Sequence, residues 1–345
     1  MEQLINIEDA LNLQAPLFID LRSPSEFEEA HIPGALNMPL FDDEERAIIG
    51  TIYKDISPEK ATEEGLSLVA PRLPELYARL KELCRKNEII LYCWRGGMRS
   101  KGICQILTVM AVKHYRLEGG YKSFRNFVIE YFSQPFLQEI IVLDGLTGVG
   151  KTDMLELLIK DNYPAIDIEG LASNKGSVFG HIGFASVPTQ KQFEGLLFAA
   201  LYRLRHLPRI IVECESRRIG KVSLPTSFFK AMENGHRVLV YDSLHNRVNR
   251  LTQTYTLKRS GAYDKELGEA INRLRKRLGH KKVNNLLELL DIKEYNSIVK
   301  VLLEDYYDPL YNYPNEPSSD YELNLNAQDM TGSVEKLKGL LESPL

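Results

Sequence analysis

The chain has 345 residues, of which 44% are hydrophobic and 26% are charged. These values are ordinary for a globular protein, and they exclude a wholly disordered, collagen-like or coiled-coil chain. At roughly 150 residues per domain the length predicts about two domains, and no stretch approaches the roughly 20 apolar residues that span a bilayer.

The first residues and the cysteines bear on where the protein works. Residues 1–14 are acidic and contain no basic segment followed by a long apolar run, so we expect no signal peptide. The four cysteines form neither a C-x-x-C pair nor the spacing of a zinc site. We therefore expect a cytoplasmic chain with reduced cysteines and no membrane partner.

Residues 1–130 alternate between strand-like and helix-like patterns. Short apolar runs at 17–21 and 88–93 predict buried parallel strands, and residues 73–84 and 102–110 show helical spacing. This alternation predicts an α/β domain over residues 1–130.

A cysteine-containing loop follows the strand at 88–93. Cys93 precedes a predicted helix, whose backbone N–H groups stabilise a thiolate together with two nearby arginines. Two glycines allow a tight cradle around an anion, a setting typical of a nucleophile that attacks sulfur, selenium or phosphorus. The candidate site consists of Cys93 as the catalytic residue and, around it, Trp94, Arg95, Gly96, Gly97, Met98, Arg99 and Ser100.

A second α/β unit begins after a boundary at 131–135. Its predicted strands lie at 139–144, 209–213 and 237–241, and its predicted helices at 264–278 and within 284–303. We therefore predict a P-loop α/β domain over residues 138–345 with a helical C-terminal part.

The loop after the strand at 139–144 matches the phosphate-binding pattern G-x-x-x-x-G-K-[ST]. Its glycines let backbone N–H groups wrap a phosphate, Lys151 adds a charge for the terminal phosphates, and Thr152 offers a hydroxyl. Such a loop recognises a diphosphate or triphosphate, not a base. The candidate residues are Gly145, Thr147, Gly148, Val149, Gly150, Lys151 and Thr152.

An acidic residue at the end of a neighbouring strand would hold a metal-bound water beside this loop. Glu213 and Glu215 occupy that place, although either is equally well explained as a capping or salt-bridging glutamate. We expect no tightly bound cofactor and no resident metal site, with Mg²⁺ as an ion that could accompany the diphosphate.

The charge is unevenly distributed. Residues 201–282 carry 19 Lys and Arg against 7 Asp and Glu, a net charge of +12, whereas the whole chain has a net charge of −4. Such a block attracts nucleic acid, or else its charge is balanced by acidic residues of 283–345 folded beside it. The candidate nucleic-acid-binding residues are Arg203, Arg205, Arg217, Arg218, Arg273, Arg275, Lys276 and Arg277.

Residues 20–35 read DLRSPSEFEEAHIPGA and resemble the signature near the start of a rhodanese domain, while LEGGY at 117–121 resembles the segment that closes one. The resemblance covers roughly residues 4–130, and it implies that Asp20, Arg22 and His31 brace the cysteine loop. One feature departs from the pattern: the loop between Cys93 and Arg99 is one residue longer than in common single-domain rhodaneses. Dual-specificity phosphatases of the same fold share the longer spacing, which admits a larger tetrahedral anion.

Because it combines the Cys93 loop with the P-loop, the chain resembles the tRNA 2-selenouridine synthase family over essentially its whole length. The resemblance implies that selenium from selenophosphate replaces the 2-sulfur of a wobble-position, 5-substituted 2-thiouridine. It also implies attachment of a geranyl group from geranyl diphosphate to that sulfur. The implied partners are the tRNAs for lysine, glutamate and glutamine, together with an enzyme that supplies selenophosphate. We expect a monomer.

In this scheme the P-loop holds the diphosphate of the geranyl donor and the Cys93 loop holds selenophosphate. The uridine sulfur is first geranylated, and selenium then displaces geranyl thiol; Cys93 either delivers selenium or acts on the phosphoryl group. The ten-carbon chain needs an apolar pocket, which we expect near the P-loop beside residues 176–183. Its candidate lining residues are Val178, Phe179, Phe184, Val187 and Phe193.

Three other functions fit parts of the sequence. A cysteine phosphatase would use the Cys93 loop but neither the P-loop nor the basic block. An ATP-dependent kinase or tRNA sulfurtransferase would use the P-loop for nucleotide. An RNA-binding protein without catalysis would leave both loops unexplained.

Overall fold

The computed structural model describes residues 3–174, 187–256, 264–311 and 313–342. The chain forms two compact units, one of residues 1–133 and 188–199 and the other of residues 134–187 and 200–345. The polypeptide therefore crosses between the units three times.

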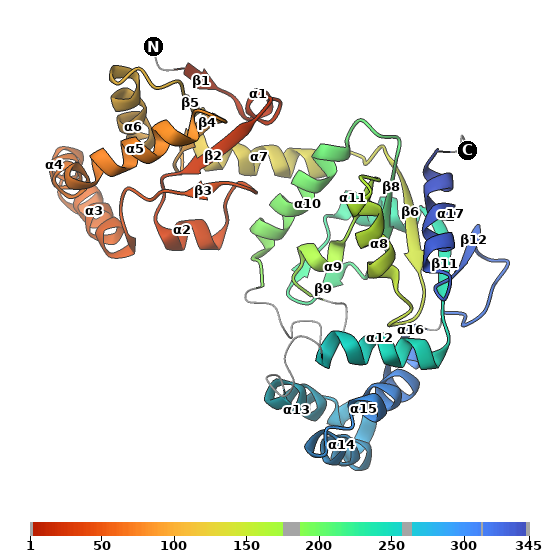
Figure 1. Ribbon diagram of the computed structural model, residues 1–345. Coiled ribbons are helices and arrows are strands. Elements are labelled where there is room, and N and C mark those ends of the chain that lie inside the picture. Colours follow the sequence, from red (N-terminus) through yellow and green to blue (C-terminus); the bar gives the residue numbers. More distant parts are fainter. Residues whose placement is uncertain (1–2, 175–186, 257–263, 312, 343–345) are drawn as a thin grey trace. The chain divides into compact units, whose positions relative to one another are not determined.

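The first unit is built on a five-stranded parallel sheet in the order β1-β5-β4-β2-β3. The strands are β1 Gln3–Ile5, β2 Pro16–Asp20, β3 Leu36–Asn37, β4 Glu88–Tyr92 and β5 Tyr115–Leu117. Strand β4 lies in the middle of this sheet (Figure 1), so the loop that follows it emerges at the centre of the carboxyl edge. In open parallel sheets this edge is where ligands bind.

Helices surround this sheet. They are α1 Ile7–Leu11, α2 Pro24–Glu29, α3 Asp43–Asp55, α4 Pro58–Val69, the short 3₁₀ turn η1 Ala70–Arg72, α5 Leu73–Leu83, α6 Met98–Val109 and α7 Gly120–Ser133. Side chains alternate along β4, and those of Ile89 and Leu91 share one core cluster with Leu80 of α5 and Ile103 of α6. Helix α6 is therefore fixed against the strand that it follows.

The second unit also has a five-stranded parallel sheet, in the order β12-β11-β6-β8-β7. Its strands are β6 Glu139–Asp144, β7 Ala165–Ile166, β8 Arg209–Glu213, β11 His236–Tyr241 and β12 Leu323–Asn326, and a separate hairpin pairs β9 Arg218–Ile219 with β10 Val222–Ser223. Strands β7 and β8, which follow β6 in the chain, lie on one side of it, and the later strands β11 and β12 lie on the other. Such a switch point opens a crevice at the end of β6.

The helices of the second unit fall into two groups. Those near the sheet are α8 Lys151–Lys160, α9 Ile168–Leu171, the end of α10 Gln190–Leu204, α11 Thr226–Glu233, α12 Leu244–Thr256 and α17 Met330–Glu342. The others are α13 Asp264–Arg273, α14 Arg275–Asp291, α15 Tyr295–Leu302, the π-helical turn η2 Leu303–Tyr307 and α16 Asp308–Tyr311. All of these except α16 share a second core cluster, to which Val248 of α12 also belongs. These observations confirm the predicted fold class: two α/β units, the second with a helical C-terminal part.

Two details differ from the expectation. The helix predicted at 264–278 ends at Arg273, and a second helix starts at Arg275 and bends at Gly279, which has a positive φ of 81°. Residues 188–199 pack with the first unit, although the sequence places them in the domain 138–345. Aromatic packing explains this placement, because the ring of Phe198 lies 5.8 Å from that of Phe124 and 5.2 Å from that of Tyr131 in α7.

Candidate functional site

The Cys93 loop joins β4 to α6 and is held in a tight turn. Gly96 has a φ of +65°, and a Cβ there would meet the Leu117 carbonyl oxygen at 3.0 Å. From the other side, the backbone N–H of Tyr121 donates to the Cys93 carbonyl at 2.9 Å. The guanidinium of Arg116 donates to the Gly96 carbonyl. The glycines of the sequence motif are thus needed where the loop contacts the β5–α7 connection.

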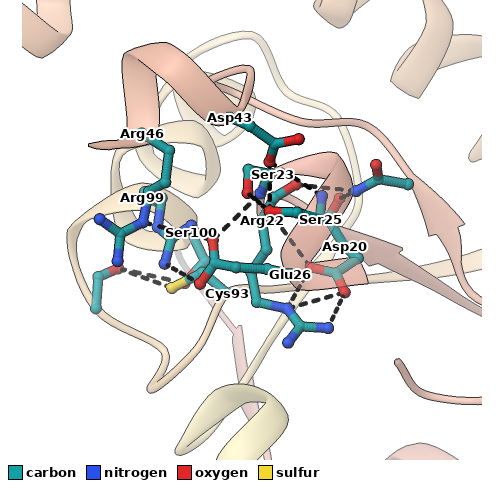
Figure 2. A network of polar contacts seen from close by, with 12 residues as sticks. Asp20, Arg22, Ser23, Ser25, Glu26, Asp43, Arg46, Cys93, Arg99 and Ser100 are labelled. Carbon is teal, nitrogen blue, oxygen red and sulfur yellow. Dashed lines mark hydrogen bonds and ion pairs between the residues drawn. The ribbon is translucent and has the colours of Figure 1, made fainter. Parts of the chain in front are cut away.

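Cys93 is a free cysteine whose side chain is only 3% exposed. Its Sγ lies 3.3 Å from the Ser100 hydroxyl and 3.9 Å from the Gly97 carbonyl oxygen (Figure 2). Ser100 is itself buried and stands in the first turn of α6. Its hydroxyl can donate to a thiolate, so the loop supplies a second polar partner for the sulfur besides the helix terminus.

Glu26 is a residue of this site that the sequence did not single out. Its carboxylate accepts from Arg99 at 2.7 Å and lies 3.5 Å from Arg46, as Figure 2 shows. Burial raises the pKa of Glu26, but the hydrogen bonds and charge of Arg99 outweigh burial and hold that pKa below its usual value. A readable signal existed, because Ser23 and Glu26 form the capping box of α2.

Arg95 differs from Arg99. Arg95 is exposed, and its side chain forms no hydrogen bond or ion pair with the described parts of the chain. Trp94 and Met98 are also open, with 37% and 55% of their surfaces exposed. The predicted loop residues are therefore brought together, but Arg99 faces a carboxylate while Arg95 is available to an incoming anion.

Asp20 at the end of β2, together with Arg22 and His31 further along the chain, forms a network of buried or partly buried contacts. Arg22 is 1% exposed and pairs with Asp20 at 2.6 Å. It also donates to the Ala30 carbonyl at 2.7 Å, and its guanidinium lies 4.3 Å from the centre of the Tyr121 ring. His31 is tied through Nδ1 to the Phe27 carbonyl at 2.9 Å. Of these residues, Arg22 reaches the Cys93 loop, since its guanidinium lies 5.8 Å from the centre of the Trp94 ring.

The P-loop follows β6 and enters α8. Gly145, Gly148 and Gly150 all have positive φ, and a Cβ on Gly145 would meet the Val240 carbonyl oxygen at 2.1 Å. Lys151 Nζ donates to the carbonyl of Gly145 at 2.7 Å, an arrangement that folds the ammonium back over the loop. A diphosphate in the loop would take over this ammonium as its partner.

Two arginines of α12 hold the same loop, and the sequence motif did not reveal them. Arg247, 1% exposed, donates to the Thr147 carbonyl at 2.9 Å and pairs with Asp308. Arg250 donates to the Gly148 carbonyl at 2.6 Å and pairs with Asp242 at 3.0 Å. They stand about a hundred residues further along the chain, so no local pattern could indicate them.

Three glutamates lie near the carboxyl end of β8. Burial raises the pKa of Glu213, and the neighbouring Glu169 raises it further. Burial likewise raises the pKa of Glu215, with Glu213 adding to the effect. Glu213 Oε1 already accepts the backbone N–H of Glu169 at 2.8 Å. Burial thus disfavours the ionised form of Glu213, and a backbone donor already occupies one of its oxygens.

The described ranges contain no group of three or more His, Cys, Asp or Glu side chains placed to hold a metal ion. Asp144, at the end of β6, is engaged by Arg237 at 2.7 Å. Mg²⁺ as an ion that accompanies the diphosphate stays a prediction.

The candidate tRNA-binding residues lie in three places. Arg203 and Arg205 are at the end of α10, Arg217 and Arg218 are at the hairpin β9–β10, and Arg273, Arg275, Lys276 and Arg277 are at the junction of α13 and α14. Some carry internal contacts: Arg205 stacks on the ring of Tyr202 at 3.9 Å, and Arg277 donates to the Tyr306 hydroxyl at 3.1 Å. Arg203 and Lys276 point their charge to solvent.

Part of the positive block is structural. Arg209, Arg237 and Arg247 pair with Glu139, Asp144 and Asp308. Lys282 pairs with Asp305 at 2.9 Å. Acidic residues of 283–345 therefore balance some of these cations, such as Arg247 and Lys282. Binding of nucleic acid by the exposed cations stays a prediction.

Comparison with known proteins decides the family. A family described as the tRNA 2-selenouridine synthase AAA domain matches residues 138–336, and the rhodanese-like domain family matches residues 2–127. The chain belongs to the tRNA 2-selenouridine synthase family.

Named relatives agree with this assignment. The tRNA 2-selenouridine synthase of Hydrogenovibrio crunogenus is 36% identical, with 86% of this chain and 88% of the relative covered. That of Shewanella piezotolerans is 34% identical, with 86% and 87% covered. That of Shewanella halifaxensis is 34% identical, with 88% and 89% covered.

The apolar pocket that we expect near the P-loop for the geranyl chain stays a prediction. Residues 176–183, with Val178 and Phe179, and also Phe184 lie outside the described residues. Val187 is 37% exposed, and Phe193 is fully buried and belongs to the first unit. None of the described helices is long and apolar enough to span a membrane.

Proposed function

We propose that this protein converts 2-thiouridine of tRNA into 2-selenouridine in two steps, geranylation followed by selenation. The observation that carries the proposal is the presence, in one member of this family, of a buried free cysteine in an anion loop and of a complete P-loop. The tRNAs for lysine, glutamate and glutamine are the proposed partners, and an enzyme that makes selenophosphate is the proposed supplier.

In the first step the 2-sulfur of the uridine attacks carbon 1 of geranyl diphosphate. A carbon–sulfur bond forms, the carbon–oxygen bond to diphosphate breaks, and the uridine loses its N3 proton. Lys151 and the loop amides stabilise the negative charge that develops on the leaving diphosphate. Arg247 and Arg250 act by keeping the loop in its binding shape.

In the second step selenophosphate binds at the Cys93 loop. Cys93 attacks the phosphorus of selenophosphate, the phosphorus–selenium bond breaks, and hydrogen selenide leaves. Water then hydrolyses the S-phosphocysteine to phosphate and the free thiol, and the hydrogen selenide adds to carbon 2. The carbon–sulfur bond then breaks, geranyl thiolate leaves, and N3 regains its proton. The exposure of Arg95 supports a role for it in binding selenophosphate, and the contact of Ser100 with Cys93 supports a role for its hydroxyl in orienting the sulfur.

The test is nucleoside mass analysis of 2-thiouridine tRNA incubated with the protein, geranyl diphosphate and selenophosphate. Addition of a geranyl group, followed by a sulfur-to-selenium mass shift, is the expected result. With the protein folded and tRNA bound, an unchanged nucleoside would refute the proposal and favour the phosphatase or the ATP-dependent function.

Two substitutions separate the steps. Cys93→Ala should abolish selenation and leave geranylation intact, because the cysteine is not needed at the diphosphate. Lys151→Ala should slow geranylation by about 10²–10³-fold, because it removes a charge from the leaving group, and selenation of 2-thiouridine tRNA falls with it. Pre-geranylated tRNA should restore selenation by Lys151→Ala. Loss of geranylation in a folded Cys93→Ala protein would contradict this division.

A further inference from the structure

A cavity of about 640 Å³ lies beside Cys93 in the first unit, a size typical of small-molecule pockets. Helices α3, α4 and α6 and the Cys93 loop line it, and it is open to solvent on one side. Its wall is mainly aliphatic and aromatic and includes Phe41, Ile49, Leu66, Leu73, Ile103 and Ile106. The sulfur-bearing residue Cys93 forms part of the same wall.

The two helices in front of this cavity leave apolar side chains uncovered. Helix α3 contributes Ile49 and Tyr53 to the cavity wall and yet has no buried residue. Tyr53 is 53% exposed, and Leu66 of α4 is 62% exposed. Apolar side chains gathered in the open around a cavity indicate a bound apolar group.

Charge divides the cavity into two ends. The charged residues of its wall are Arg46, Arg95 and Arg99, and two of them share the carboxylate of Glu26. The polar end therefore coincides with the Cys93 loop, while the remainder is apolar. A trianion such as selenophosphate fits only the polar end, so the apolar part needs a different occupant.

We propose that the apolar part of this cavity holds the geranyl chain of S-geranyl-2-thiouridine during selenation. This inference rests on the two-step function proposed above. An apolar chain in the cavity brings the carbon–sulfur bond that must break to the Cys93 end. After cleavage the cavity retains geranyl thiol, whose apolar tail would otherwise enter water.

Gly102 allows a direct test. This half-buried residue of α6 lines the cavity, and a Cβ at this position would meet no atom within 4 Å. The series Gly102→Ala, Gly102→Leu and Gly102→Phe therefore fills the cavity progressively without a clash at the first carbon. The matched control is Gly339→Phe, which adds the same ring to an exposed glycine of α17 in the other unit, also with no atom within 4 Å.

Binding is measured through Trp94, the single tryptophan of the chain, which also lines the cavity. Titration with the nucleoside S-geranyl-2-thiouridine should change its fluorescence in a saturable way, whereas S-methyl-2-thiouridine should not. Gly102→Phe should weaken this binding by at least about tenfold, and Gly339→Phe should bind as the wild type does.

Turnover gives the second readout. With pre-geranylated tRNA and selenophosphate, Gly102→Phe should raise KM about tenfold, and the rise should grow along the series Ala, Leu, Phe. If the wild type selenates this tRNA but Gly102→Phe keeps the wild-type KM and Trp94 response, the cavity is not the geranyl site. If the wild type binds the nucleoside but never selenates, the cavity assignment stands and the proposed function fails.

Discussion

At the scale of single residues, Cys93 and Lys151 are recognisable in the sequence because each belongs to a short motif between a strand and a helix. Glu26 and Arg247 are not, because their functional partners are 73 and 100 residues away in the chain. A sequence motif identifies the residues that contact the ligand. Residues that support the loop, such as Glu26 and Arg247, come from distant parts of the chain and are identified only in the folded structure.

Replacing Glu26 tests its link to Arg99. In Glu26→Gln the first unit should lose about 1–2 kcal/mol at neutral pH, since a charge-assisted hydrogen bond is removed. Because the folded-state pKa of Glu26 is depressed, its contribution is present above the ordinary value of 4.5 and is lost as the pH falls through the folded-state pKa. Urea unfolding should therefore separate the two proteins at pH 7 and bring them together in acid. An equal difference at both pH values would contradict this.

Glu213 predicts the opposite dependence on pH. Its pKa is raised, chiefly by burial, so folding becomes less favourable as the pH rises from the ordinary value of 4.5 towards the folded-state pKa. Glu213→Gln, which cannot ionise, should raise the melting temperature of the second unit by about 2–4 °C near pH 8 and by less near pH 5. The control Glu156→Gln changes an exposed glutamate of α8 and should have no such trend. A pH-independent gain would argue against a raised pKa.

At the scale of elements, the main strands could be predicted and the short ones could not. The apolar runs of β2, β4, β6, β8 and β11 stand out, whereas β3 and β7 have two residues each and carry no periodicity. The cavity beside Cys93 was also missed. Its wall comes from α3 and α4, whose apolar residues could equally have belonged to an ordinary core.

The start of α7 controls the Cys93 loop. Gly120 has a φ of +60°, and a Cβ there would lie 2.3 Å from the Cys93 carbonyl oxygen. Gly120→Ala should therefore destabilise the first unit by roughly 1–3 kcal/mol and reduce selenation, while geranylation by the P-loop continues. Gly339→Ala, at an open helical position, is the control. Thermal unfolding with step-resolved mass analysis checks both effects, and a loss confined to geranylation would refute them.

At the scale of the whole molecule, net charge is a poor guide until the paired residues are removed from it. The block 201–282 has a net charge of +12, but several of its arginines are bound to carboxylates of the second unit. The sequence indicated an attraction for polyanions. It could not say which cations remain for a partner, because that depends on pairs distant in the chain.

Arg203 at the end of α10 and Lys276 at the α13–α14 junction represent two of the three groups of candidate tRNA-binding residues. If each contacts a tRNA phosphate, each alanine substitution should lower the slope of log affinity against log salt by about 1, and the double variant by about 2. Lys60→Ala, on the exposed face of α4 in the first unit, is the control. Binding of 2-thiouridine tRNA measured at several salt concentrations gives the slopes. An unchanged slope would remove that position from the tRNA path.

Helix α10 has a consequence for the order of events during synthesis. Its first residues complete the first unit, where Phe198 covers Phe124 and Tyr131, yet they are translated after β6, the P-loop and α8. N-terminal domains generally fold first as the chain emerges. Here the first unit stays unfinished, with aromatic rings uncovered, until residue 199 has left the ribosome. A polypeptide released at residue 133 would carry that bare aromatic face permanently, and it should aggregate unless residues 188–199 are supplied.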